Sequence, residues 1–87
     1  MLLFFTDRHK NFVGSVYHKD IQGYDFVEGP DYTKLIVLLN HNRSDLEFEF
    51  PRGDLLSNDD KVSVLTIIEK TVSEAIKGKF IAWVQVG

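Results

Sequence analysis

Residues 57–78 read SNDDKVSVLTIIEKTVSEAIKG, and the rest of the chain can be interpreted around them. Ser57 is a favourable N-cap residue, and Asp59 and Asp60 place carboxylates where the exposed amides of a helix start favour negative charge. Gly78 is typical of a helix end, because glycine readily takes the left-handed conformation that closes a helix. The sequence therefore predicts a helix over this stretch.

Apolar residues recur every three or four positions along this helix, and polar residues fill the positions between them. The apolar set is Val64, Leu65, Ile68, Val72, Ala75 and Ile76, and the polar set is Ser63, Thr66, Lys70, Ser73, Glu74 and Lys77. We therefore expect one face of the helix to pack on a core while the opposite face contacts water.

Short apolar or alternating runs before and after the helix predict six strands. These runs are residues 2–6, 12–18, 22–27, 34–40, 46–50 and 80–86. A tight hairpin predicted at residues 19–21 and other short connections indicate an antiparallel meander, and the helical crossover lets the sixth strand lie parallel to the fifth or the first. The predicted fold class is α+β, in the order βββββαβ. We expect one domain over residues 1–87, a mostly antiparallel sheet of five to six strands with one amphipathic helix packed on one face.

One helix covers only one face of such a sheet, yet the strands at residues 2–6, 34–40 and 80–86 carry apolar side chains on both faces. Something else must cover the second face. We expect a homodimer in which two copies pack sheet to sheet and bury Ile81 and Trp83. Two alternatives stay open: the sheet curls into a partial barrel, or strong twist lets one copy cover itself.

Composition places the chain among small acidic proteins. Its 87 residues carry a formal net charge of −3, and residues 31–60 hold seven acidic and three basic side chains. The absence of cysteine excludes disulfides and thiolate metal sites and favours a reducing compartment. The longest apolar run, residues 35–39, is far too short to span a membrane. We therefore expect a cytoplasmic protein with no membrane partner.

Acidic residues alternate with apolar ones along the predicted strand at residues 46–50. Asp45, Glu47 and Glu49 should project from its outer side. Such a row can bind another protein that has a basic surface, although it also serves to keep a half-buried strand wet and to prevent edge pairing. We expect a small non-enzymatic protein-interaction module, adaptor- or inhibitor-like, of the kind found among bacterial and phage accessory proteins.

The alternative function is nucleic-acid binding. Arg8, His9 and Lys10 form a short basic loop, and Tyr17 and Tyr24 lie in predicted strands. Basic groups would contact phosphates while aromatic rings stack on unpaired bases. The net negative charge argues against this alternative, and packing in the core is the more common use of such aromatic residues.

Few residues suggest catalysis. The histidines, His9, His18 and His41, stand in or beside predicted loops without the spacing of a metal site. Asp7 and Asp20 lie close enough in sequence to orient an imidazole for base catalysis, but no nucleophile accompanies them. The glycines form no phosphate-binding loop. We therefore expect no enzyme activity, no metal and no cofactor, and a small histidine-dependent hydrolase is the weakest alternative.

Overall fold

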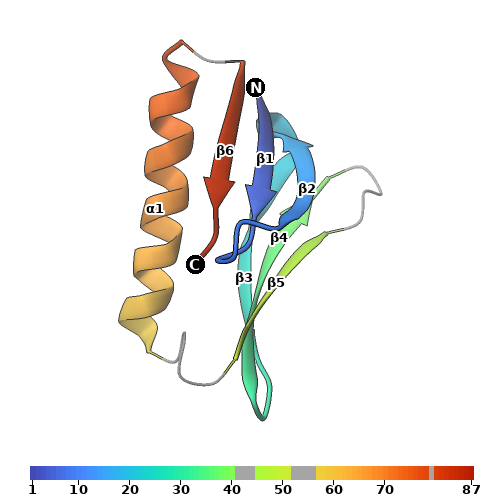
Figure 1. Ribbon diagram of the computed structural model, residues 1–87, viewed down its shortest axis with the longest axis vertical. Coiled ribbons are helices and arrows are strands. Elements are labelled where there is room, and N and C mark those ends of the chain that lie inside the picture. The colour runs from blue at the N-terminus through green and yellow to red at the C-terminus, as the bar shows by residue number, and fades with distance from the viewer. Residues whose placement is uncertain (41–44, 52–56, 79) are drawn as a thin grey trace.

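The computed structural model describes residues 1–40, 45–51, 57–78 and 80–87, so His41 lies outside the described residues. In chain order the elements are β1 (Leu2–Thr6), β2 (Phe12–Tyr17), the 3₁₀ helix η1 (His18–Asp20), β3 (Ile21–Glu28), β4 (Tyr32–Leu39), β5 (Leu46–Pro51), α1 (Asn58–Ile76) and β6 (Ile81–Gln85) (Figure 1). The α+β class and the order of five strands, a helix and a strand are confirmed. No helix in these segments is long and apolar enough to cross a membrane.

The six strands of the described residues form two sheets of three strands each, rather than the single sheet of five to six strands that we expected. Sheet A has the strand order β2-β1-β6, and sheet B has the order β3-β4-β5. Sheet B is antiparallel throughout. In sheet A, β1 pairs antiparallel with β2 and parallel with β6, from Leu2 opposite Ile81 to Thr6 opposite Gln85. Of the two neighbours that the sequence allowed for the last strand, the first strand is the correct one.

The predicted hairpin at residues 19–21 is replaced by η1, which carries the chain from one sheet to the other. The His18 N–H donates to the Met1 carbonyl, 2.9 Å away, and so ties the start of η1 to sheet A. The Asp20 carbonyl accepts from the Asn40 N–H, also at 2.9 Å, and ties the end of η1 to sheet B. Because the two ends bond to different sheets, β2 and β3 do not pair with each other.

The start of α1 is closed by a capping box. The Ser57 hydroxyl accepts a hydrogen bond from the Asp60 N–H at 3.1 Å, and the Asp60 carboxylate accepts one from the Ser57 N–H at 3.4 Å. Two amides that lack a partner within the helix are thereby satisfied. The predicted helix start is confirmed.

The end of α1 differs from the prediction. Among the described residues, Gly87 is the one glycine with a positive φ. Gly78 therefore does not take the left-handed conformation that we expected. The Gly78 N–H instead bonds the Ala75 carbonyl at 3.3 Å. Ile76 is 56 % exposed although the periodicity places it on the core face. The buried face is therefore narrower than expected, with Ile68, Val72 and Ala75 at its centre.

Both sheets and the helix enclose one hydrophobic core. Its buried members are Leu3, Phe5, Val16, Leu35, Val37, Phe48, Phe50, Ile68, Val72, Ala75, Ala82, Val84 and Val86. The Phe5 ring of sheet A lies 5.9 Å from the Phe48 ring of sheet B, centroid to centroid. Each sheet therefore covers the inner face of the other, with α1 as the third wall (Figure 1).

The two sheets approach closely where β2 meets β5. A Cβ atom on Gly14 would lie 2.6 Å from Leu46 Cδ2, so glycine allows this approach. The register of β1 and β2 shifts between Phe5 and Thr6, next to the same glycine. Such a bulge reverses the faces of the residues beyond it, and Val13 packs on the core while Phe12 is exposed.

Candidate interaction surfaces

The outer face of sheet B carries most of the predicted acidic site. In the strand register, Asp25 lies opposite Ile36, and Ile36 lies opposite Glu47. Directly opposed residues share a face of the sheet. Asp25, Glu47 and Glu49 are all exposed, and Lys34 is opposite Glu49. We call these three carboxylates with Lys34 the acidic face.

Charge on the acidic face is only partly compensated. Three carboxylates and one ammonium group leave a formal charge of −2. The ammonium of Lys34 lies 4.0 Å from the Glu47 carboxylate, and the two side chains are 30 % and 59 % exposed. An exposed pair at this distance contributes little to stability, so it leaves both groups able to bind a partner.

The three predicted acidic residues differ in what they do. Glu47 and Glu49 point outward while Phe48 and Phe50 are buried, so the predicted alternation of β5 is confirmed. Asp45 accepts a hydrogen bond from the Leu39 N–H at 2.9 Å and thereby joins the start of β5 to the end of β4. Its carboxylate has a structural partner that the sequence did not indicate.

Asp25 was not predicted as part of this site. Its alternation with Tyr24 and Phe26 indicates an outward side chain, but the register that places it beside β5 is not visible in the sequence. Its carboxylate also accepts from the Phe26 N–H at 2.9 Å. In sheet B, β3 is an edge strand, so this bond satisfies an amide at that edge.

The outer face of sheet A is aromatic. Trp83 of β6 stacks on Phe4 of β1, with ring centroids 4.9 Å apart and an interplanar angle of 24°. Phe12 completes the row, with its centroid 6.2 Å from that of Phe4. Phe12 is 57 % exposed, Ile81 51 % and Trp83 63 %. We call the outer side chains Leu2, Phe4, Phe12, Tyr17, Ile81 and Trp83 the aromatic face.

The basic loop lies close to the acidic strand. Asp7 organises this loop by accepting hydrogen bonds from the N–H groups of His9 and Asn11, both at 2.9 Å. The hydrogen bond from the backbone N–H of Asn11 is the main reason that the pKa of the Asp7 carboxyl is below its ordinary value. A hollow of about 300 Å³ separates the loop from β5, and Arg8 and Glu49 both line it. Negative charge beside the loop weakens its attraction for phosphate.

The residues predicted for nucleic-acid binding do not form one surface. Arg8, His9 and Lys10 lie between β1 and β2, whereas Tyr17 lies at the other end of β2. Tyr24 faces α1 and packs against the core. Burial, and next the negative charge of Glu69, raise the pKa of the Tyr24 phenol.

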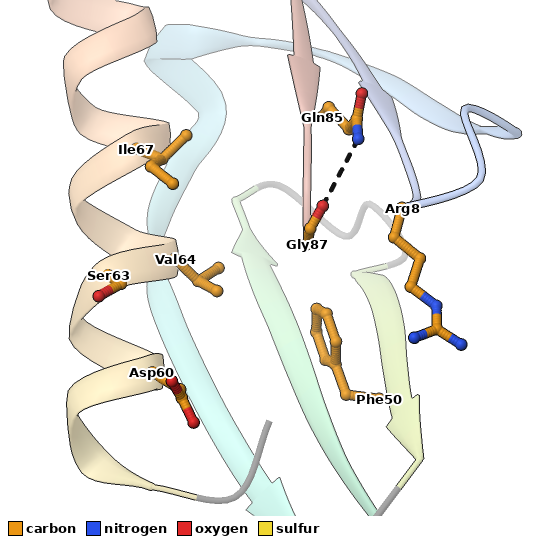
Figure 2. A pocket seen from close by; sticks show the side chains of 8 residues that line it. All are labelled: Arg8, Phe50, Asp60, Ser63, Val64, Ile67, Gln85 and Gly87. Carbon is orange, nitrogen blue, oxygen red and sulfur yellow. Dashed lines mark hydrogen bonds between the residues drawn. The ribbon is translucent and has the colours of Figure 1, made fainter. Parts of the chain in front are cut away.

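A cavity of about 490 Å³ lies between the first half of α1 and the end of β5. Figure 2 shows Val64 and Ile67 on its helical wall, with Phe50 projecting from β5 and the Arg8 guanidinium turned away from the helix. Asp60 also lines the cavity, and its carboxylate already accepts the capping hydrogen bond from the Ser57 N–H. Val64, Ile67 and Phe50 give the cavity an apolar wall, and the described lining residues include no histidine to activate the Ser63 hydroxyl.

Within the described segments, no group of three histidine, aspartate or glutamate side chains is placed to hold a metal ion. The two outer faces therefore remain as the candidate functional surfaces, one acidic and one aromatic. Comparison of the chain with protein families, with curated proteins and with solved structures finds no match in any of the three.

Proposed function

We propose that this chain is a small non-enzymatic protein-interaction module, adaptor- or inhibitor-like, whose acidic face binds a basic surface on another protein. The observation that supports this proposal most directly is the grouping of Asp25, Glu47 and Glu49, which come from two strands and share one exposed face. Grouped charges of one sign attract an oppositely charged surface and orient it before contact.

Rigidity of the strands adds to this proposal. Glu47 and Glu49 alternate with Phe48 and Phe50, which are only 3 % and 4 % exposed. Their backbone is therefore fixed by the core, and little entropy is lost there when a partner binds. Ile36, flanked by Asp25 and Glu47, adds a half-buried apolar contact at the centre of the face.

The test is a charge reversal with a matched control. The variant Glu47→Lys/Glu49→Lys changes the net charge by four units, and Asp59→Lys/Glu69→Lys makes the same change on exposed positions of α1. Each protein is used as immobilised bait for an extract of the native host, at low salt and at about 0.5 M salt, where screening suppresses surface electrostatics. The proposal expects proteins that the wild type and the helix variant retain at low salt and the strand variant loses.

Equal retention by the strand variant would contradict the proposal. A separate titration with single- and double-stranded oligonucleotides examines the alternative function. Binding that Arg8→Glu abolishes and Glu47→Lys leaves intact would favour nucleic acid over a protein partner.

A further inference from the structure

We infer that the aromatic face of sheet A is a self-association surface, on which a second copy of this chain packs sheet to sheet. The proposal starts from the stacked pair of Phe4 and Trp83, which lies on the side of the sheet opposite the core. Its neighbours Phe12 and Ile81 are also more than half exposed. Nothing in the described residues covers this surface.

The exposed area is close to what a stable contact needs. Since a whole aromatic side chain presents about 150–250 Å², the aromatic face offers on the order of 500 Å² per copy. Two copies would then bury about 1,000 Å², the lower limit for a specific interface. The inference therefore expects a weak, concentration-dependent dimer rather than an obligate one.

Charge selects a second copy as the occupant. The paired rows of the outer face are Tyr17, Leu2 and Ile81, and next to them Ser15, Phe4 and Trp83, none of which is charged at neutral pH. A nucleic acid or an anionic membrane would need cations at these positions. The acidic face lies on the other sheet, so two acidic copies that meet through sheet A keep those carboxylates far apart.

Two flanking charges also complement each other in one symmetric arrangement. The Lys19 ammonium lies 5.8 Å from the Tyr17 ring, at the β2 side of the face. Glu74 of α1 lines a hollow of about 290 Å³ with Ile81 and Trp83, at the β6 side. A two-fold axis along the strands places β2 of one copy over β6 of the other. Because Tyr17 and Ile81 share one row, Lys19 of each copy then lies near Glu74 of the other.

Sedimentation velocity on the whole chain, from about 1 µM to about 1 mM, tests the association. We expect a monomer–dimer equilibrium for the wild type and a monomer at all concentrations for Trp83→Glu. The control is Val62→Glu, which introduces the same charge at a side chain that is 62 % exposed on α1. Circular dichroism confirms that each variant is folded.

Charge exchange tests the arrangement. Lys19→Glu and Glu74→Lys should each raise the dimer dissociation constant about fivefold, and the double variant should restore it. A double variant no tighter than either single variant would overturn the two-fold arrangement.

Three results would overturn the inference itself: a wild type that stays monomeric, a Trp83→Glu variant that still dimerises, or a Val62→Glu variant that is as monomeric as Trp83→Glu. A monomeric wild type whose Trp83→Glu variant loses oligothymidylate or another protein would assign the face to that partner instead. The Glu47→Lys/Glu49→Lys variant should dimerise normally, so failure of this inference and failure of the proposed function are distinguishable.

Discussion

Lys61, near the start of α1, donates a hydrogen bond to the Glu28 carboxylate at the end of β3 and so joins the helix to sheet B. The Lys61 ammonium also lies 5.6 Å from the centre of the Phe26 ring. Glu28 accepts a second hydrogen bond, at 2.9 Å, from the hydroxyl of the fully buried Thr33. One carboxylate therefore connects the helix, the edge strand and the core.

The Glu28 carboxylate should make stability depend on acid. The hydrogen bond from Lys61, and next the one from Thr33, lower the pKa of Glu28 below its ordinary value of 4.5. A group whose folded pKa is depressed stabilises the folded state above its unfolded pKa, and this contribution is lost as the pH falls through the folded pKa. We therefore expect stability to fall below about pH 4.5.

Glu28→Gln should remove part of this acid dependence, and Lys61→Met should reduce it, in urea titrations repeated at several pH values. The Asp7 carboxylate, whose pKa is also lowered, should account for part of what remains. An unchanged acid profile in Glu28→Gln would show that this carboxylate does not fasten the helix.

Phe5 and Phe48 join the two sheets, so truncating either ring should destabilise the whole fold. Phe5→Ala should lower the free energy of unfolding by about 3–5 kcal/mol, because Phe5 is fully buried and leaves a cavity. Phe5→Leu should cost less and remain folded. Urea denaturation of Phe5→Ala, of Phe48→Ala and of the double variant measures the coupling between the two rings. Strict additivity of the two losses would contradict a direct contact between the rings.

Because the capping box stabilises the start of α1, Ser57→Ala should lower the free energy of unfolding. Removal of the hydroxyl leaves the Asp60 N–H without its side-chain acceptor, at a cost of about 1 kcal/mol. Ser63→Ala is the control, because Ser63 is exposed within the same helix. Equal denaturation midpoints for the two variants would mean that the cap contributes nothing.

The Tyr24 phenol should make the free energy of unfolding depend on pH in the alkaline range. Burial raises the pKa of its phenol above the ordinary value of 10.0, so the folded state keeps the proton longer than the unfolded state does. Stability should therefore fall as the pH rises above about 10. Phenolate absorbance in Tyr24→Phe should lose the late-titrating component, whereas the control Tyr17→Phe, at a residue that is 49 % exposed, should retain it.

Local patterns in the sequence predicted the elements but not their assembly. Alternation along β5 and the N-cap at Ser57 depend on neighbouring residues, and both predictions are confirmed. The prediction of a hairpin after Tyr17 was wrong, because the conformation of this connection is set by hydrogen bonds to Met1 and Asn40, which are distant in sequence. Apolar residues on both faces of a strand indicate double coverage, but they do not distinguish one broad sheet from two facing sheets.

The same limit applies to the candidate surfaces. Glu47 and Glu49 were found by their spacing within one strand, whereas Asp25 joins them only through the register of β3 on β4. Phe12 joins the aromatic face because of a bulge in the β1–β2 pair. Alternation alone placed Ile81 and Trp83 on the face that the helix does not cover, and both are exposed on the aromatic face.

The parallel pairing of β1 with β6 has a consequence for how the chain folds. Strands β3, β4 and β5 are contiguous in sequence, so sheet B can assemble from contacts that are local in the chain. Sheet A is complete only when residues 81–85 pair with β1, which lies between β2 and β6. Closing so long a stretch of chain is slow, and until then the apolar first strand needs protection from aggregation.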